Sequence, residues 1–488
     1  MIELSKKVIN PSVFKILLLL VIFPMNVEFV HQLCGGYVKY VLLFGILVCT
    51  SMLLSKQLIS NIKNDKIVIL LLLFSAAYFV TILFNREYGF IDNIKKNIYF
   101  IVFILLLVLI PTQKDLSSVK NNIKVFSYVL VCVTFLLSFV SLFTYVFGIT
   151  IFYNTIDSSF SDVTTLNIVG YIDALYGLYN PNTCGAISAL SLITTIVLFV
   201  EAVKDNNKKT LLKVTVLLLL IINIFVQYST LLLSMSRGGL YSSIFIIALI
   251  AFVSLIKSKD IKINVVRVVI AIIVPLFIVS CIVLTSKPII NKYASIREDV
   301  TVNYPEKTII EEDMGKLIKL VDEKATFAFI KPFLLDVGIN NNVDLSHVFE
   351  MSGRSQLWKY GFKIFTKSPI IGSTKQGLTI NLMDYLGDGV LQGGVHNIYL
   401  TILISSGLIG FLLYLFAVAI VFLRAFKAII KSKNIDYDLL LCFAIVVFYL
   451  LTEFVEQRTV YTVSIFSVTF WTYFGFLNYF SKKVLEEA

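Results

Sequence analysis

The sequence predicts an all-α polytopic membrane protein, and three observations support that fold class. Hydrophobic residues make up 58% of the 488 residues, and the mean hydropathy is +0.87, which is far from the composition of a soluble globular protein. Apolar runs of about 17–25 residues, long enough to cross a bilayer, recur along most of the chain. Finally, lysines and arginines gather in the short segments between alternate apolar runs, as expected for cytoplasmic loops.

The apolar runs predict about twelve transmembrane helices. The first run is interrupted by Pro24, and the fourth is short. The twelve runs fall near residues 12–31, 37–55, 67–84, 97–112, 123–148, 182–202, 211–234, 240–256, 263–286, 398–423, 438–455 and 460–480.

Charge bias predicts the orientation of the helices. If the N-terminus is cytoplasmic, the alternate loops that face the cytoplasm carry most of the short clusters of basic residues. The segment with Arg86, Lys95 and Lys96 is the exception, because this orientation places it on the extracytoplasmic side. Both termini are then cytoplasmic. The +11 net charge reflects this loop pattern, so we expect no nucleic-acid partner.

The predicted helices divide the chain into three regions. Residues 1–286 form transmembrane helices 1–9, residues 287–397 form a large extracytoplasmic loop, and residues 398–488 form helices 10–12 and a cytoplasmic tail. Apolar spacing predicts helices over 306–324 and 355–367 within the loop. A membrane anchor does not need a large polar insertion, whereas an enzyme acting at the membrane surface does. The loop is therefore expected to carry catalytic residues.

Three rare side chains are the candidates for chemistry. The chain has seven arginines against 35 lysines and only three histidines, and arginine suits bidentate recognition of an anion. Arg237, Arg354 and His396 each stand at the predicted N-terminal edge of a helix on the outer face. Each also has a structural interpretation: Arg237 as an anchor at the headgroups, Arg354 as a surface cation and His396 as a structural hydrogen-bonding residue. Asn397 equally suits a helix cap.

Together these positions favour an anion such as a diphosphate. Helix N-termini present unpaired N–H groups and partial positive charge, and two arginines would add to that field. No C-x-x-C pair, Asp-rich pair or His cluster with metal-ligand spacing occurs, so we expect neither a metal nor another cofactor.

An ordered set of motifs resembles the O-antigen ligase and O-antigen/capsule polymerase (WaaL/Wzy-like) membrane glycosyltransferases. The resemblance covers most of residues 180–425. One departure is Ser405-Ser406 before Gly407, where an acidic residue is common in the family. The motifs are, in order, Asn180-Pro181-Asn182, Ser236-Arg237-Gly238, Gly353-Arg354-Ser-Gln-Leu-Trp358, Ser368-Pro369-Ile-Ile-Gly372, His396-Asn397-Ile-Tyr399-Leu400 and Gly407-Leu-Ile-Gly410.

The resemblance implies a GT-C-like enzyme of the bacterial cytoplasmic membrane with its active site on the extracytoplasmic face. Its implied donor is an oligosaccharide linked to undecaprenyl diphosphate, and transfer proceeds with inversion and without a metal. By resemblance, Arg237 and Arg354 would bind the leaving diphosphate, and His396 would be the general base. Asp157, Asp162 and Asp173, on an outer segment without Lys or Arg, are alternative bases. Asn182 and Asn397 are further candidate substrate-binding residues. The membrane lipid, a chain-length regulator and a flippase are the other implied partners.

Three functions remain open. A polymerase adds the glycan to another lipid-linked repeat unit, and we favour it because Ile-, Asn- and Lys-rich chains commonly accompany polysaccharide gene sets. A ligase transfers the glycan to a lipid A core or another surface acceptor and shares the donor site. A non-enzymatic transporter of lipid-linked sugars would need polar residues lining a path at mid-membrane depth, whereas the helix interiors of this sequence are largely apolar.

Overall fold

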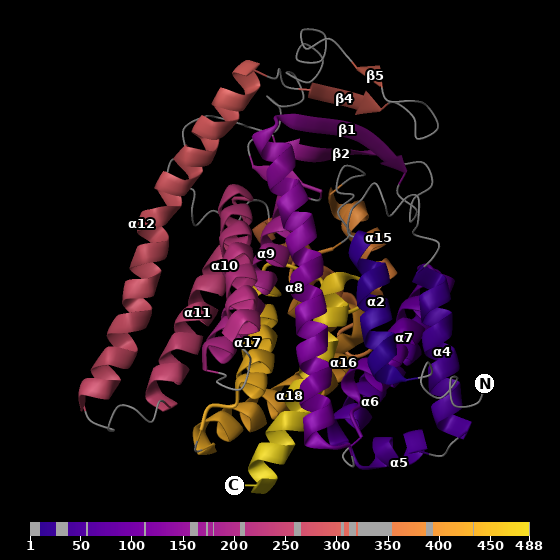
Figure 1. Cartoon of the computed structure of the whole chain (residues 1–488). Coiled ribbons are helices and arrows are strands. Elements are labelled where there is room, and N and C mark those ends of the chain that lie inside the picture. Colours follow the sequence, from indigo (N-terminus) through magenta and orange to yellow (C-terminus); the bar gives the residue numbers. More distant parts are fainter. Residues whose placement is uncertain are drawn as a thin grey trace, which may run out of the picture.

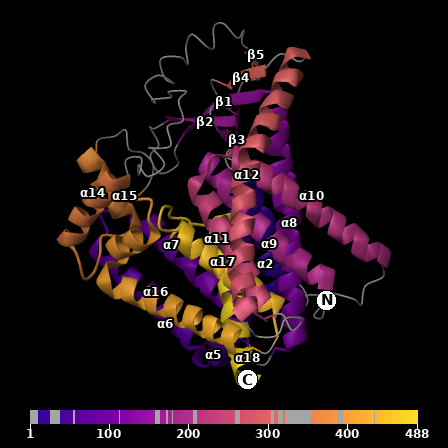
Figure 2. The same cartoon turned by 90° about the vertical axis from the view of Figure 1, so that its left-hand side faces the viewer.

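The protein is a helical bundle capped at one end by a small sheet (Figure 1). The computed structural model describes residues 10–25, 38–54, 57–111, 114–156, 164–171, 174–178, 180–204, 210–257, 265–303, 307–311, 319–320, 354–386, 394–432 and 434–487. Figure 2 shows α14 (Arg354–Lys367) and α15 (Lys375–Leu386) beside α16 (Ile398–Lys431) on one flank. Helix α12 (Val265–Asn303) lies at the edge of the bundle in Figure 1.

Each of the twelve predicted apolar runs coincides with a helix. Six helices of the described chain are long and apolar enough to cross a membrane, and three further apolar helices are shorter. The predicted number of twelve spans and the GT-C-like architecture stay predictions. The helices that match the runs, in order, are α2 (Pro11–Met25), α4 (Val38–Leu54), α6 (Lys66–Phe84), α7 (Phe90–Phe103) continued by the π-helix η2 (Ile104–Val108), α8 (Leu116–Val146), α9 (Pro181–Lys204), α10 (Thr210–Leu233), α11 (Arg237–Lys257), α12 (Val265–Asn303), α16 (Ile398–Lys431), α17 (Tyr437–Thr452) and α18 (Ile465–Glu487).

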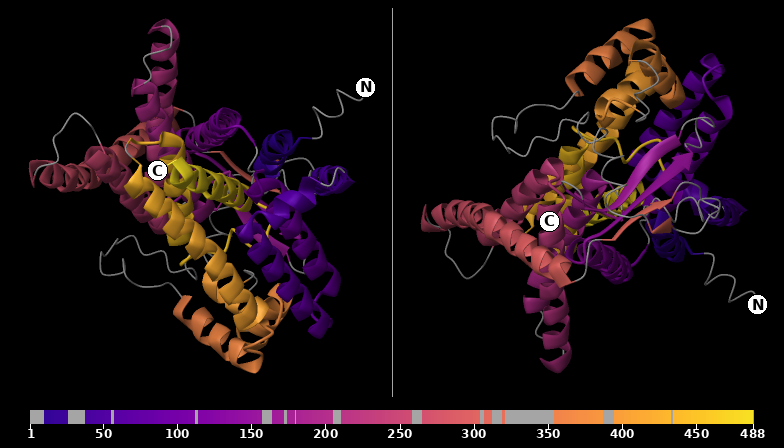
Figure 3. Two further views of the ribbon diagram at one scale, coloured as in Figure 1. Left: turned by 90° about the horizontal axis from the view of Figure 1, so that it is seen from below. Right: turned by 90° about the horizontal axis from the view of Figure 1, so that it is seen from above.

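Helix α18 lies at the centre of the bundle (Figure 3), where its aromatic residues fill the core. Trp471 and Phe474 are fully buried. Gly475 lets the helix approach η2 closely, because a Cβ there would overlap the carbonyl oxygen of Leu107. Large apolar side chains on outlying helices are exposed, as expected for surfaces that face lipid rather than water; they include Leu211, Leu219, Phe225 and Phe277.

The bundle interior also contains a polar cluster between α8, α9 and α10. Ser138 Oγ donates to Gln227 Oε1 over 2.8 Å, and Asn223 Nδ2 donates to Thr195 Oγ1 over 2.6 Å. Gln227 Nε2 donates to Asn223 Oδ1 over 3.0 Å. The helix interiors are therefore less uniformly apolar than the sequence suggested. Because these groups hydrogen-bond one another across helices, they join the helices together.

A five-stranded sheet of order β3-β2-β1-β4-β5 was not predicted. It comprises β1 (Ile149–Ile156), β2 (Thr164–Tyr171), β3 (Leu175–Gly177), β4 (Lys307–Glu311) and β5 (Lys319–Leu320). The predicted helix over 306–324 is wrong, because β4 and β5 occupy its described residues. The segment Thr308-Ile309-Ile310 is β-branched and pairs in parallel with β1, with Ile309 opposite Ile151. Asp157, Asp162 and Asp173 lie outside the described residues.

Within the predicted loop, the structure describes one helix that was predicted and one that was not, and the boundaries of the loop stay a prediction. Helix α12 continues to Asn303, beyond the predicted boundary at residue 287. The predicted helix over 355–367 is confirmed as α14 (Arg354–Lys367). A second helix, α15 (Lys375–Leu386), follows it and was not predicted. Polar Gln376, Thr379 and Asn381 interrupt its apolar pattern, so it gave no clear helical signal.

The turn between α14 and α15 fits into a break in α16. Gly407 has φ 65° and ψ −176° inside α16. Leu408 N donates to Pro369 O over 2.9 Å, and Ser373 N donates to Ile404 O over 2.9 Å, so the turn satisfies backbone groups that the break leaves open. A Cβ at Gly407 would overlap the carbonyl oxygen of Ile370. The Ser368–Gly372 and Gly407–Gly410 motifs are therefore explained by this packing.

Candidate active site

Arg354 stands in the first turn of α14, which is held against the start of α16. Trp358 Nε1 donates to Val395 O over 2.9 Å, one turn along α14 from Arg354. Gly361 lies one turn further on, where a Cβ would be 3.0 Å from Val395 and 3.1 Å from Ile404. This close approach of α14 brings Arg354 beside His396.

His396 lies in a short segment that is fixed against the loop between α17 and α18. Its φ is 47°, in the left-handed region that few non-glycine residues adopt. On one side, Gly394 packs against the side chain of Gln457, which a Cβ would overlap. On the other side, Ile398 N donates to Glu453 O over 3.0 Å. The backbone that carries the imidazole is therefore anchored on both sides of the residue.

Asn397 caps α16, as one of its two interpretations predicted. Its Oδ1 accepts from Leu400 N over 2.9 Å, and its Nδ2 donates to Phe454 O over 3.1 Å. Both ends of the amide thus take part in holding α16 against the loop. Substrate binding by Asn397 stays a prediction.

Charged side chains within the loop between α17 and α18, residues 453–464, hold the loop in one conformation. Glu453 accepts from Arg458 N through both carboxylate oxygens, over 3.1 and 3.0 Å. Burial raises the pKa of Glu453 to about 7, against the lowering effect of those hydrogen bonds and of the Arg458 charge. The guanidinium of Arg458 also lies 4.7 Å from the centre of the Phe466 ring. These contacts fix the loop and place Glu456 towards α14.

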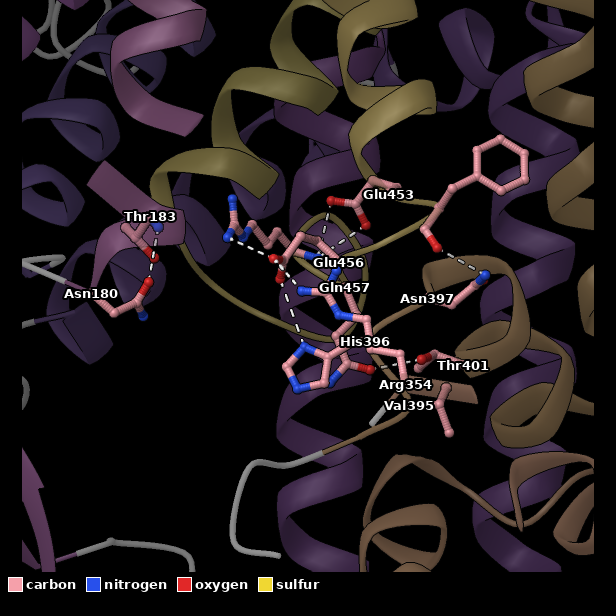
Figure 4. Close-up of polar contacts among 12 residues, drawn as sticks. Asn180, Thr183, Arg354, Val395, His396, Asn397, Thr401, Glu453, Glu456 and Gln457 are labelled. Atoms are coloured by element: carbon pink, nitrogen blue, oxygen red, sulfur yellow. Dashed lines mark hydrogen bonds and ion pairs between the residues drawn. The ribbon is translucent and has the colours of Figure 1, made fainter. Parts of the chain in front are cut away.

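Glu456 joins the candidate residues into one cluster. Its Oε1 lies 3.3 Å from Nη2 of Arg354 and 3.3 Å from Nη2 of Arg458. Its Oε2 lies 3.7 Å from Nδ1 of His396. Figure 4 shows Arg354, His396 and Glu456 pointing toward one another from three separate segments. Two arginines and a histidine therefore share a single carboxylate, which we call the Glu456 cluster.

The electrostatics of the cluster favour an ionised Glu456. Its side chain is only 14% exposed, and burial alone would raise its pKa. The charges of Arg458, His396 and Arg354 outweigh burial and hold the pKa of Glu456 below its usual value. His396 Nδ1 is itself buried and has no hydrogen-bond partner within 3.5 Å among the described residues, so Glu456 is its nearest charged neighbour.

Arg237 begins α11 close to the same loop. Its side chain is exposed. A Cβ on the next residue, Gly238, would be 3.3 Å from Val455, the neighbour of Glu456. The backbone at Arg237 thus lies beside the loop that carries the cluster, and the side chain extends from the same end of the bundle.

Asn182 lies in the first turn of α9, which packs against the turn before Arg237. A Cβ on Gly185 of α9 would overlap Ser236, and one on Gly239 would be 3.0 Å from Gly185 O. Asn182 is exposed, whereas Asn180 caps the helix by accepting from Thr183 N over 2.8 Å. The first turns of α9 and α11, which carry Asn182 and Arg237, are therefore in contact. In Figure 4, Asn180 marks the start of α9, to the left of the cluster.

Sequence reasoning missed Glu456 and Arg458, because residues 453–464 looked like a plain connector between the last two helices. One signal was present. Two glutamates and an arginine stand in a loop of only twelve residues that charge bias places outside, where topology does not require charge. Among the described residues, no group of three or more His, Cys, Asp or Glu side chains is arranged to hold a metal ion.

Comparison with known protein families gives one match. Residues 218–415 match the family model described as O-antigen ligase. The matched stretch contains Arg237, Arg354 and His396 and ends before Glu456. No curated protein matches the chain. The match over residues 218–415, together with the apolar helices, supports an assignment to the O-antigen ligase and polymerase family of bacterial membrane glycosyltransferases.

Proposed function

We propose that the protein is a polysaccharide polymerase of the bacterial cytoplasmic membrane. It transfers an oligosaccharide from undecaprenyl diphosphate to a hydroxyl of another lipid-linked repeat unit, with inversion and without a metal. The observation that carries the proposal is the Glu456 cluster, since Arg354 and His396 meet there although 42 residues separate them in the sequence. The start of α11, with Arg237, lies beside the same loop.

The two arginines are proposed to bind the diphosphate of the donor. A guanidinium has five N–H donors in a fixed fork that matches phosphate oxygens. Arg354 contacts Glu456 through one nitrogen at 3.3 Å, and its side chain is 22% exposed, so part of the fork faces outward. Arg237 extends from a helix N-terminus, whose partial positive charge also favours a phosphate. Both groups would stabilise the negative charge that develops on the leaving diphosphate.

His396 is proposed to be the general base, with Glu456 as the residue that orients it. When Nδ1 carries the proton facing Glu456, Nε2 has a free lone pair with which to accept a proton. The imidazole is 25% exposed, so an acceptor sugar can reach it. The same carboxylate would stabilise the imidazolium that forms.

The reaction balances with these groups alone. The acceptor hydroxyl oxygen attacks the anomeric carbon of the donor sugar and gives its proton to Nε2 of His396. The bond between the anomeric carbon and the diphosphate oxygen breaks, and undecaprenyl diphosphate leaves with the electron pair. Attack from the face opposite the leaving group inverts the anomeric centre. Asn182, at the neighbouring helix start, is proposed to bind the donor beside Arg237.

A ligase is the second candidate, favoured by the description of the matching family model as O-antigen ligase. It would use the same donor site and transfer the glycan to a lipid A core or another surface acceptor. A transporter of lipid-linked sugars is a weaker candidate. The buried polar cluster of α8, α9 and α10 gives it some polar residues, but these groups are engaged with one another rather than lining a path.

Deleting the gene and separating the surface glycans on a gel tests the proposal. For a polymerase, single repeat units accumulate on the carrier or acceptor, and long chains disappear. For a ligase, full-length chains remain on the carrier lipid. Unchanged glycans on both the carrier and the surface would contradict both activities. The deletion can be repeated in strains that lack the flippase or chain-length regulator gene. If deletion removes long chains only where these genes are present, the flippase and the regulator are supported as functional partners.

A further inference from the structure

A cavity of about 450 Å³ with a mixed polar and apolar lining lies between α2, α4, α5 (Gln57–Lys63), the linker after η2, the start of α8, and α18. Its volume is within the range of about 300–1,000 Å³ found for small-molecule sites. Two lysines, Lys15 and Lys114, line it together with the amide side chains of Asn10, Asn61 and Asn122. All of these side chains can donate hydrogen bonds.

The cavity is remote from the Glu456 cluster. Near the cavity, Lys120 of α8 pairs with Asp436 at the start of α17 over 2.8 Å. Glu453 follows the opposite end of the same helix, which has 16 residues. At a rise of 1.5 Å per residue, that helix separates its two ends by about 24 Å. Figure 1 shows α5 at the bottom of the bundle, opposite the sheet.

The two lysines lack the carboxylate partners that their neighbours have. Lys120 pairs with Asp436, Lys124 with Glu201 and Lys482 with Asp65 at the same end of the bundle. Lys15 and Lys114 form no ion pair among the described residues, and no Asp or Glu occurs among the described residues that line the cavity. Their charges are therefore not neutralised by the part of the protein that the structure describes.

The hydrogen bonds and the cation–π contact of the two lysines are to neutral groups. Lys15 is 6% exposed, donates to Leu107 O over 3.0 Å and lies 4.6 Å from the centre of the Phe476 ring. Lys114 Nζ donates to Ser12 Oγ over 3.3 Å. Burial lowers the pKa of Lys114. Withdrawing two like charges from water without a counter-ion is costly, so an anion in the cavity would be stabilising.

We propose that this cavity binds the phosphate group of an anionic ligand, with Lys15 and Lys114 as the counter-charges. Phosphate oxygens accept hydrogen bonds from ammonium, amide and hydroxyl groups, which make up the polar lining. Met52, Ile110 and Phe476 form an apolar part of the wall, which suits the alkyl portion of a phospholipid. A membrane phospholipid and free phosphate are the two sources of such a group. This phosphate site does not depend on the glycan transfer proposed at the Glu456 cluster.

Thermal unfolding of the purified full-length protein in neutral detergent tests the proposal. The probes are phosphatidylglycerol, zwitterionic phosphatidylcholine and inorganic phosphate. Phosphatidylglycerol is expected to raise the Tm of the wild type more than phosphatidylcholine does. Lys114→Gln removes one charge-assisted hydrogen bond and is expected to weaken the apparent affinity for the anionic probe about tenfold. Lys431→Gln is the matched control, because it removes an exposed lysine outside the cavity, in the last turn of α16.

A second variant keeps the test decisive if Lys114→Gln does not fold. Asn122→Asp puts a carboxylate among the residues that line the cavity and should abolish the effect of the anion. If inorganic phosphate matches the lipid, the ligand is a soluble phosphate; if only phosphatidylglycerol acts, it is a lipid headgroup. Equal responses of the wild type, Lys431→Gln and both cavity variants to all probes would overturn the proposal.

Discussion

At the scale of single residues, Glu456 is the side chain on which the candidate site depends most. It contacts Arg354, Arg458 and His396 from one carboxylate. Removing it would leave two buried or half-buried arginines without their shared partner and a histidine without its nearest carboxylate. One substitution therefore tests the organisation of the whole cluster.

Acid should weaken the fold through Glu456. Its pKa lies below the ordinary value of about 4.3, so the ionised form stabilises the folded state fully above that value and loses the effect as the pH falls through the lowered pKa. We expect Glu456→Gln to unfold at a lower temperature than the wild type at pH 7, and this difference to shrink below about pH 4. Thermal unfolding between pH 7 and pH 3 measures it.

The control for this experiment is Glu486→Gln, since Glu486 is exposed and pairs with Lys483, one helical turn before it, over 3.0 Å. That variant should follow the wild-type profile. A constant difference between Glu456→Gln and the wild type across the pH range would contradict the assignment of an ionised Glu456.

The sequence predicted part of this cluster. Arg354 and His396 stood out because arginine and histidine are rare in the chain and both precede helices. Glu456 did not stand out, because its importance comes from contacts with Arg354 and His396, which are 102 and 60 positions away in the sequence. Arg458 joins the cluster only through Glu456. Such a tertiary contact leaves no periodic pattern along the chain.

At the scale of elements, the break in α16 links the loop region to the bundle. Gly407 adopts φ 65°, and the turn from Ser368 to Thr374 bonds to the carbonyls that the break exposes. Because α14 precedes this turn and α15 follows it, the break determines where Arg354 lies relative to His396.

Replacing Gly407 should therefore disturb the position of α14. In Gly407→Ala, the left-handed backbone and the overlap with Ile370 O are expected to cost at least about 2 kcal/mol of stability. Leu408→Ala is the control, since Leu408 is 45% exposed. The Tm of both purified variants measures the effect, and a wild-type Tm for Gly407→Ala would contradict the described packing.

Hydropathy predicted the helices well and the sheet poorly for a physical reason. A long apolar run in a membrane must satisfy its own backbone hydrogen bonds, so it forms a helix almost regardless of its detailed sequence. The segment 306–324 lies outside such a run, and its apolar spacing fitted a helix. Its pairing with β1 is long-range, with Ile309 opposite Ile151, and tertiary pairing overrode local spacing.

At the scale of the whole molecule, the helix starts of α9, α11, α14 and α16 gather at one end, and the phosphate-binding cavity lies at the other. The proposed orientation makes the first end extracytoplasmic and the second cytoplasmic. This orientation rests on the distribution of lysines and arginines in the sequence.

Cysteine labelling tests the orientation. In a background without the six native cysteines, Gln356→Cys on α14 should react with a membrane-impermeant maleimide in intact cells. Lys431→Cys, at the opposite end of α16, should react only after the cells are permeabilised. Both positions are exposed in the structure, so the reverse pattern would contradict the proposed topology.

The central claim is that Arg237, Arg354 and His396 act together on a lipid diphosphate. The most direct measurement is glycan chain length in a deletion strain that expresses Arg237→Ala, Arg354→Ala or His396→Ala, with Arg86→Ala as an exposed arginine control. Losses of about 10²-fold or more in transfer are expected for each of the three site variants, with membrane levels like the wild type and normal chains for Arg86→Ala. Normal chain length in all three site variants would contradict the account.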